Sequence, residues 1–347
     1  MSVLALRVTD SGGTQDYDWV EVTITDGQGP KLTATLEPFA SPEGWSRADT
    51  SVKLRADDYP AGFASMTYEA TGAQSFPSTT VTQNLATLRV TEHGQTTIRF
   101  TAKDKLGNTS PVKVVVVKMD RVAPTVTTPT VQLVAPQTLG SDIISARISW
   151  TGSDVDSGLN RYQLEQSING ATYTRIGIAS PLATSTTKNV PVGSTVRFRV
   201  RAIDAVENIG AWVETPVYTV APYQETSADI AYVGNWTSKT QSGAFGGTYV
   251  ESPTGTSSAT FTFTGRQVAW VAREFTAYGK AEVWLDRVKV ATIDLHATSS
   301  LTRRILWTSP LVNPAVSHTV QIKYTGLKNG SATGTTISVD GFITLEQ

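Results

Sequence analysis

Short runs in which apolar and polar residues alternate recur along the whole chain. In the clearest run, Val196-Arg197-Phe198-Arg199-Val200-Arg201-Ala202, every second side chain is apolar. A period of two places successive side chains on opposite faces of a β-strand, whereas a helix needs a period near 3.6. Clusters of Gly, Pro, Asp and Asn separate the runs, as they do where turns join short strands. The sequence therefore predicts an all-β protein.

Composition narrows the class of protein. The chain has 347 residues, which allows two to four domains, and charged residues make up only 17%. It has no cysteine, so disulfides and thiolate metal sites are excluded. A net charge of −1 without a basic stripe disfavours nucleic acid as a partner. No apolar run approaches the roughly 20 residues that span a bilayer, so we expect no membrane insertion.

The N-terminal segment 1–27 predicts a single hairpin. Apolar alternation from Val3 to Val8 leads to a turn at Asp10–Gly13 and then to a strand over Trp19–Ile24. The run LRVTDSGGTQDYDWVEVTI resembles the last two strands of a PKD-type Ig-like domain. A lone hairpin is marginal in water. We therefore interpret 1–27 as the C-terminal hairpin of a truncated PKD/Ig-like domain, and the chain as a piece of a longer secreted protein.

Two further units follow, over 28–121 and 122–222. In the first, GWSRADTSVKLRADD and TTIRFTAKDKLGNTSPVKVVVVKMDRVAPT resemble bacterial extracellular Ig-like repeats. In the second, ISWTGSDVDSGLNRYQLEQSINGATYTRI and GSTVRFRVRAIDAVENIGAW resemble a fibronectin type III domain, with Trp150 as the expected core anchor. Glu207 stands where the family usually has Gly, so that turn is expected to differ. Both resemblances imply β-sandwiches.

The composition changes in 223–347. Four tryptophans and five tyrosines fall in this unit, and Gly-rich turns separate its strands. The pattern GNWTSKTQSGAFGGTYVES, ATFTFTGRQVAWVA, GKAEVWLDRVKVATIDLH and ISVDGF resembles the carbohydrate-binding-like jelly-roll modules of bacterial secreted proteins. The expected architecture is thus tandem Ig-like/fibronectin type III-like β-sandwiches with a C-terminal jelly-roll β-sandwich.

Catalytic signatures are missing from the sequence. Its three histidines belong to no recognisable metal-binding or triad motif, and there is no phosphate loop or dinucleotide fingerprint. The acids Glu274, Asp286 and Asp294 lie within one stretch, but we interpret them as turn and surface carboxylates. The sequence predicts a protein that is not an enzyme and that requires no cofactor.

Aromatic residues of the last unit are the candidates for ligand contact. Flat indole and phenol rings can stack on the apolar faces of sugars while polar neighbours bind the hydroxyls. In Glu282-Val283-Trp284-Leu285-Asp286 the indole shares the charged face of the strand, which is unusual. The predicted ligand-binding residues are Trp284, Tyr278, Arg273 and Trp236, with Trp270 assigned to the core. The alternative is that these rings pack a second layer or a domain interface.

Acidic residues mark a second candidate site, for calcium. The loops at one end of a sandwich cluster where the chain enters, and Ca²⁺ prefers six to eight oxygen ligands. The predicted metal ligands are Asp120, Asp154, Asp156 and Asp204, with Asn208 nearby, and the preceding unit repeats the pattern in Asp57, Asp58, Asp104 and Asn108. The alternative is that these side chains form Asx-turns with loop amides.

Three functions remain open. In the first, Ig-like spacers present a glycan-binding jelly roll on a secreted or cell-surface bacterial protein, whose partner is a polysaccharide or surface glycan. In the second, the chain is a structural stalk, adhesin shaft or filament subunit that self-associates and takes no small ligand. In the third, it is the C-terminal accessory region of a secreted hydrolase. The Arg197, Arg199 and Arg201 ladder is interpreted as an exposed sheet face partly paired with Glu165, an anionic ligand being the alternative.

Overall fold

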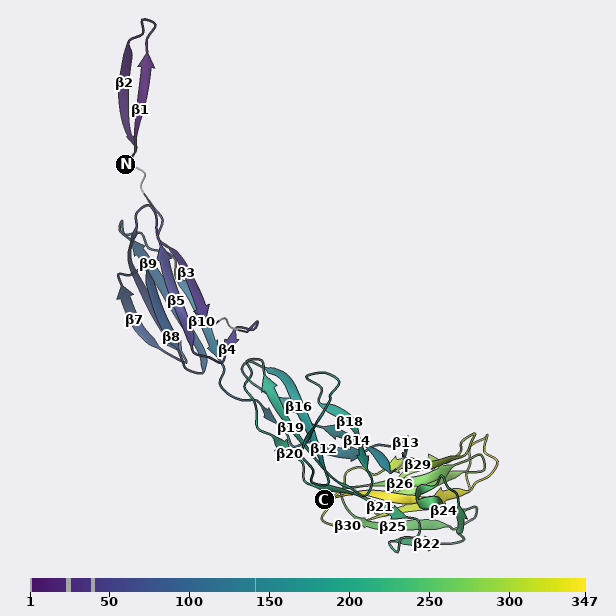
Figure 1. Ribbon diagram of the computed structural model, residues 1–347. Coiled ribbons are helices and arrows are strands. Elements are labelled where there is room, and N and C mark those ends of the chain that lie inside the picture. Colours follow the sequence, from purple (N-terminus) through teal and green to yellow (C-terminus); the bar gives the residue numbers. More distant parts are fainter. Residues whose placement is uncertain (1, 23–25, 39–40, 141) are drawn as a thin grey trace. The chain divides into compact units, whose positions relative to one another are not determined.

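The computed structural model describes residues 2–22, 26–38, 41–140 and 142–347, and many of its strands are labelled in Figure 1. Thr23 and Ile24 of the expected strand Trp19–Ile24 lie outside these residues. Strands and turns make up almost everything described, with a single turn of 3₁₀ helix, η1 (Phe245–Gly247). The all-β prediction is confirmed. None of the described helical segments is long and apolar enough to cross a membrane.

The described residues group into two compact units, which we treat separately. Unit 1 contains residues up to Val122 together with the segments Val155–Gly158 and Ala205–Asn208. Unit 2 contains Ala123–Asp154, Leu159–Asp204 and Ile209–Gln347.

Unit 1 begins with the expected hairpin, β1 (Ser2–Thr9) and β2 (Gln15–Val22), which pair only with each other. A two-sheet sandwich follows. One sheet has the order β3-β5-β8, with β3 (Lys31–Glu37), β5 (Thr50–Asp57) and β8 (Leu85–Val90). The other has the order β4-β10-β9-β6-β7, with β4 (Trp45–Ser46), β6 (Phe63–Gly72), β7 (Phe76–Val81), β9 (Gly94–Asp104) and β10 (Lys113–Met119).

The sandwich of unit 1 forms because alternate residues of its strands are apolar. On β5, Val52, Leu54 and Ala56 are buried, while the residues between them are more exposed. They pack against the inward residues of the second sheet, which include Met66, Ile98, Phe100, Val117 and Met119.

The first part of unit 2 is a fibronectin-like sandwich. One of its sheets contains β12 (Thr130–Leu133), β14 (Ile143–Ser149) and β18 (Ser185–Pro191). The facing strands are β16 (Leu159–Ile168), β17 (Thr174–Ile176), β19 (Thr195–Asp204), β20 (Val213–Glu214) and β21 (Tyr218–Gln224). A short ribbon pairs β11 (Thr125–Val126) with β15 (Gly152–Ser153). Trp150 is buried and packs edge-on against Tyr162, as expected of a core anchor.

The jelly roll is the second part of unit 2. One of its sheets has the order β22-β25-β30-β27-β28, with β22 (Ile230–Val233), β25 (Ser258–Thr264), β27 (Lys280–Leu285), β28 (Val288–Asp294) and β30 (Ser317–Tyr324). The other strands are β26 (Gln267–Glu274), β29 (Leu301–Thr308) and β32 (Gly341–Glu346), and a short sheet of β23 (Thr237–Thr240), β24 (Thr248–Ser252) and β31 (Ile337–Val339). Trp270 is fully buried in its core, as expected.

One continuous sheet joins the two parts of unit 2. Its order is β13-β29-β26-β32-β21-β19-β16-β17, where β13 is Gln137–Thr138 and β20 pairs beside β19. The expected domain boundary after Pro222 falls inside β21, whose residues 219–224 pair with β32. Strand β26 is consequently buried on both faces: Val268 and Trp270 belong to the jelly-roll core, and Ala269 and Val271 to the core of the fibronectin-like sandwich.

Candidate functional site

Trp284 lies on the solvent face of the five-stranded jelly-roll sheet, as its place in the sequence predicts. On β27, Ala281 and Val283 are buried, while Glu282 and Trp284 are half-buried on the other face. This follows from the two-residue period of a strand, because the apolar residues take the core side. The indole is therefore available at the surface without being part of the core.

Polar side chains from three neighbouring strands surround this indole. Trp284 pairs in register with Gln321 on β30, and Gln321 pairs with Thr260 on β25. The Gln321 amide donates to the Thr260 hydroxyl at 2.9 Å. In the adjacent row, Glu282 pairs with Lys323. We call the outward side chains Thr260, Glu282, Trp284, Lys289, Gln321 and Lys323 the Trp284 face.

Electrostatic contacts fix the orientation of the Trp284 ring. Its Nε1–H donates to Glu282 Oε2 at 3.0 Å, and Lys289 Nζ contacts the other oxygen of Glu282 at 2.6 Å. The Lys289 hydrogen bond, followed by that of Trp284, holds the pKa of Glu282 below its ordinary value. Lys323 Nζ lies 4.0 Å from the ring centroid, a cation–π contact. The face thus combines a planar ring with donors and acceptors of both charges.

Tyr278 corrects one expectation. It was predicted to meet a ligand from a loop, but its side chain is only 2% exposed. The Tyr278 hydroxyl donates to Glu251 Oε2 at 2.6 Å, and Arg273 Nη1 donates to it at 3.3 Å. Burial, followed by the hydrogen bond with Glu251, raises the pKa of Tyr278. The Tyr278 ring belongs to the jelly-roll core, so it offers no surface to a sugar.

Arg273 stands beside Tyr278 and is held from several sides. Its Nη1 also donates to the Tyr249 hydroxyl at 2.8 Å, and its Nε and Nη2 donate to Ser300 Oγ at 3.2 and 3.1 Å. The guanidinium lies 4.4 Å from the Phe275 ring centroid. These contacts use most of its five donors. The sequence did not single out Tyr249 and Glu251, because they stand on β24, far from Arg273 along the chain.

Trp236 is half-buried after β22, at the opposite edge of the sheet from β28. Its Nε1–H donates to the Val233 carbonyl at 3.0 Å, and its ring centroid lies 5.3 Å from that of Tyr232. Strands β25 and β30 separate β22 from β27, a distance of about 14 Å at strand spacing. The structure therefore brings Arg273 and Tyr278 together but leaves Trp284 and Trp236 apart.

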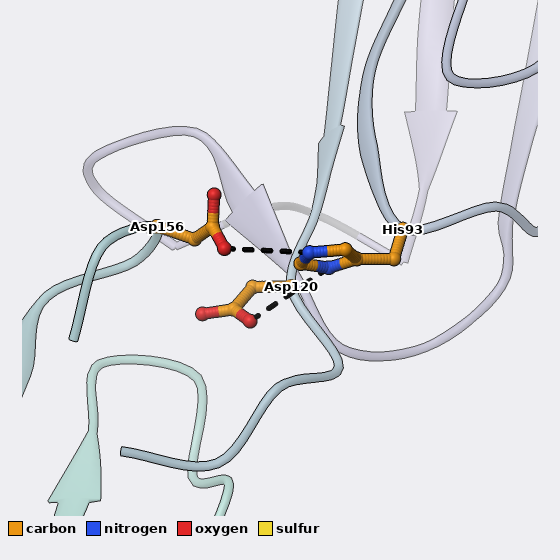
Figure 2. Close-up of side chains that lie close together, drawn as sticks. All are labelled: His93, Asp120 and Asp156. Carbon is orange, nitrogen blue, oxygen red and sulfur yellow. Dashed lines mark ion pairs between the residues drawn. The ribbon is translucent and has the colours of Figure 1, made fainter. Parts of the chain in front are cut away.

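The four predicted metal ligands are divided between the units. In unit 2, Asp204 is buried, and carboxylate oxygens of Asp154 and Asp204 lie within 4.8 Å of each other. In unit 1, Asp120 and Asp156 flank His93, which follows β8 (Figure 2). His93 Nε2 is 3.4 Å from Asp156 Oδ2, and its Nδ1 is 4.0 Å from Asp120 Oδ1.

Asp120 is fully buried, and both oxygens of its carboxylate already accept hydrogen bonds from backbone amides. Its Oδ1 accepts from the Val122 amide at 3.0 Å, which is the Asx-turn alternative, and its Oδ2 accepts from the Ser157 amide at 3.1 Å. His93 Nδ1 accepts from the Arg121 amide at 3.3 Å, so the proton of a neutral His93 lies on Nε2, facing Asp156. The observed geometry forms an Asp–His–Asp bridge, and calcium at these residues stays a prediction.

The acids at the other end of the unit 1 sandwich behave similarly. Asp26, Asp58 and Asp104 lie within 4.8 Å of one another. Asp104 accepts hydrogen bonds from the amides of Leu106 and Asn108 and from the Asn108 side chain, and Asp58 accepts from the Gly62 amide. Asp57, which was also expected here, pairs with Arg55 instead.

Comparisons with known proteins add little beyond the fold. No family model matches the chain, and no curated protein matches it. A two-domain fibronectin type III segment of chicken tenascin is 16% identical over 55% of this chain and 98% of that chain, with a TM-score of 0.22. Fibronectin(III)-like modules of Clostridium thermocellum CbhA are 18% identical over 52% and 91%, with a TM-score of 0.23.

A third solved structure comes from a study of carbohydrate-binding modules of the β-sandwich superfamily. It is 10% identical over 93% of this chain and 100% of that chain, with a TM-score of 0.24. Scores this low carry no weight for the function of this chain, so the functional argument rests on its own side chains.

Proposed function

We propose that this protein binds a glycan, without catalysis, on the Trp284 face of its jelly roll. The observation that carries the proposal is the half-buried indole, bonded to Glu282 among polar side chains on the solvent side of a sheet whose other side is core. A sugar can stack on such a ring, while Gln321, Glu282 and Lys323 bind its hydroxyls. We place the protein outside the cell, as a secreted or surface component with a polysaccharide partner.

Lys323 covers the face of the Trp284 ring that a ligand would contact. Its ammonium lies over the indole, on a flexible four-carbon stem. Moving it aside costs a cation–π contact of about 0.5–1 kcal/mol at an exposed site. A stacked sugar replaces that contact and gives the ammonium a hydroxyl to bind. The Lys323 side chain is therefore expected to act as a cover that becomes a donor.

The structural alternative, a stalk or filament subunit without a small ligand, is favoured by the burial of Tyr278, which removes one expected contact ring. The two proposals differ at Trp284: the first requires its indole for binding, whereas the second gives it no ligand. The third hypothesis, that the chain is the C-terminal accessory region of a secreted hydrolase, is compatible with both the glycan-binding and the structural proposal.

The test measures binding of the full chain and of its Trp284→Ala variant to immobilised glycans and then to soluble polysaccharide. We expect Trp284→Ala to weaken binding by roughly 10- to 100-fold, because stacking contributes about 1–3 kcal/mol. Trp19→Ala removes an indole that is 64% exposed in unit 1 and should leave binding unchanged. A folded protein that binds no glycan, or that binds equally well without Trp284, rejects the proposal.

A further inference from the structure

A pocket of about 470 Å³ opens on the fibronectin-like part of unit 2. It lies between the β16–β17 turn and the start of β19. Its lining includes Ser167, Thr172, Tyr173, Thr195, Arg197 and Val217. The volume falls within the range of small-molecule sites, roughly 300–1,000 Å³, and is large enough for one sugar ring.

The shape of the pocket follows from a tight turn in the sequence. Asn169 and Gly170 have φ values of 52° and 73°, both in the left-handed region that Asn and Gly adopt in tight turns. The turn is fastened on both sides, since Ala171 N donates to the Ile168 carbonyl and Thr195 N donates to Asn169 Oδ1. The rim of the pocket is therefore preformed, which lowers the entropic cost of binding.

Two polar atoms at this pocket are buried without a hydrogen bond of good geometry, the hydroxyl of Tyr173 and the Nε of Arg197, although Arg197 and Glu214 lie close enough to that hydroxyl to influence its pKa. Burial of an unsatisfied donor is unfavourable. Burial, followed by the nearby charge of Glu214, raises the pKa of Tyr173, so its hydroxyl keeps its proton. Both atoms have almost no exposed surface, so each donates to an entering oxygen only once its side chain has shifted toward the pocket.

The one charged side chain that lines the pocket is paired. Arg197 Nη1 contacts Glu214 Oε2 at 3.1 Å, which leaves Arg197 without a net charge to attract an anion. Farther along β19, Arg199 Nη2 pairs with Glu165 Oε2 at 2.6 Å, the partner that the sequence predicts for this ladder. The site instead offers donors and acceptors side by side, as vicinal hydroxyl groups require.

Tyr173 also supplies a rigid ring beside these groups. The Arg199 guanidinium lies 3.8 Å from the Tyr173 ring centroid, and Arg199 in turn lies 4.5 Å from the Trp212 centroid. This stack holds the tyrosine in place through its contact with Arg199, while the tyrosine lines the pocket. A fixed aromatic next to hydroxyl-binding groups is suited to a sugar.

We infer that this pocket is a second carbohydrate site, which takes one uncharged sugar residue through Tyr173 and Arg197, with Glu214 holding the Arg197 guanidinium. It is separate from the Trp284 face and does not depend on it. A chain with both sites can hold two points of one polysaccharide, or two chains, and so gain avidity when both are engaged.

The test follows the Nε–H resonance of Arg197 in the nitrogen-15 spectrum of the full chain. Methyl glycosides of glucose, galactose and mannose are titrated to millimolar concentrations, with methyl glucuronide as the charged comparison. We expect a saturable shift with at least one neutral glycoside and a weaker response to the glucuronide. Tyr173→Phe, which removes only the hydroxyl, and Arg197→Lys, which keeps the charge but removes Nε–H, should each weaken binding roughly tenfold. For the lysine variant, neighbouring amide signals report binding.

Matched controls separate this site from general effects and from the Trp284 face. Tyr59→Phe changes a tyrosine that is 92% exposed in unit 1, and Arg147→Lys changes an exposed arginine on β14. Both, and Trp284→Ala, should leave the Arg197 shift intact. The inference is overturned if no neutral glycoside moves the Arg197 signal, if the glucuronide binds more tightly, or if folded Tyr173→Phe and Arg197→Lys proteins bind like the unchanged chain.

Discussion

Asp340 is a carboxylate held in the interior of the jelly roll, where the charged form is costly. It is fully buried, and both of its oxygens accept from the Phe245 amide, at 3.0 and 3.1 Å. Burial, opposed by that hydrogen bond and reinforced by the charge of Glu225, raises the pKa of Asp340 from 3.8 to about 7. The hydrogen bonds of Asp340 join η1 to the start of β32, and the raised pKa favours the protonated carboxyl there.

This shift predicts a pH dependence of stability. A raised pKa means that the folded state keeps the proton which the unfolded state releases, so stability falls as pH rises from about 4 to 7. The loss approaches about 4 kcal/mol at 1.4 kcal/mol per unit. Denaturant unfolding followed by tryptophan fluorescence measures it, because all tryptophans except Trp19 and Trp45 lie in unit 2. Asp340→Asn should flatten the dependence, exposed Asp16→Asn should not, and an unchanged slope in Asp340→Asn contradicts the prediction.

His318 acts in a neighbouring pH range. Its ring nitrogens face Asp286 Oδ2 at 2.7 Å and the Asn313 carbonyl at 2.9 Å, and both partners are acceptors. Burial opposes the charged ring, but the hydrogen bonds to Asp286 and to the Asn313 carbonyl, together with the charge of Asp286, outweigh it and raise the pKa of His318 above 6.5. The contribution of His318 to the free energy of unfolding is therefore complete below pH 6.5 and is lost as pH rises through the raised pKa. This loss remains when Asp340 is replaced.

At the scale of the element, β26 shows what a sequence pattern can and cannot tell. Its run Val268-Ala269-Trp270-Val271-Ala272 predicts a strand, and Trp270 was correctly assigned to the core. A run that is apolar at every position is typical of a strand buried on both faces. The pattern does not name what covers the second face, because the partner residues, among them Leu133 and Leu139, lie more than a hundred positions earlier.

The candidate site was predictable to a similar extent. The alternation of Glu282, Val283 and Trp284 fixed which face the indole takes, since local periodicity decides that. Register partners such as Gln321 and Lys323 depend on strand pairing across the sheet, which local sequence does not encode. Tyr278 was misplaced for the same reason: its burial follows from Glu251 and Arg273, which approach it from other strands.

Gln267 makes the junction of the two cores testable. This residue at the start of β26 is 3% exposed, and its side chain bonds the backbone of Leu133 in both directions, at 2.6 and 3.3 Å, and the Ser309 carbonyl at 2.8 Å. Gln267→Ala leaves these buried groups unpaired and should lower the free energy of unfolding of unit 2 by about 1–3 kcal/mol. The exposed neighbour Gln132→Ala should change it little. Equal effects of the two substitutions in denaturant titrations would refute the role given to Gln267.

At the scale of the molecule, the shared sheet joins the two parts of unit 2 into one compact unit. The jelly roll contributes fully buried side chains to the core of the fibronectin-like sandwich, namely Ala269, Val271, Ile305, Ile343 and Leu345. It also depends on β21, which pairs with both β19 and β32. A cut at 222/223 exposes this face to water at about 1.5–3 kcal/mol for each large aliphatic side chain, and it leaves β32 with an open edge.

We therefore expect a fragment of residues 223–347 to aggregate or remain loosely packed, while residues 123–347 fold to a monomer. Size-exclusion chromatography and near-ultraviolet circular dichroism distinguish these outcomes, since the second reports fixed surroundings of Trp270 and Trp307. A variant of the short fragment with Val271→Thr and Ile343→Thr should be more soluble, because its exposed face is less apolar. A monomeric short fragment with the aromatic spectrum of the longer one would show that the jelly roll is independent. In that case, the continuous sheet is a contact between separate domains and not a common core.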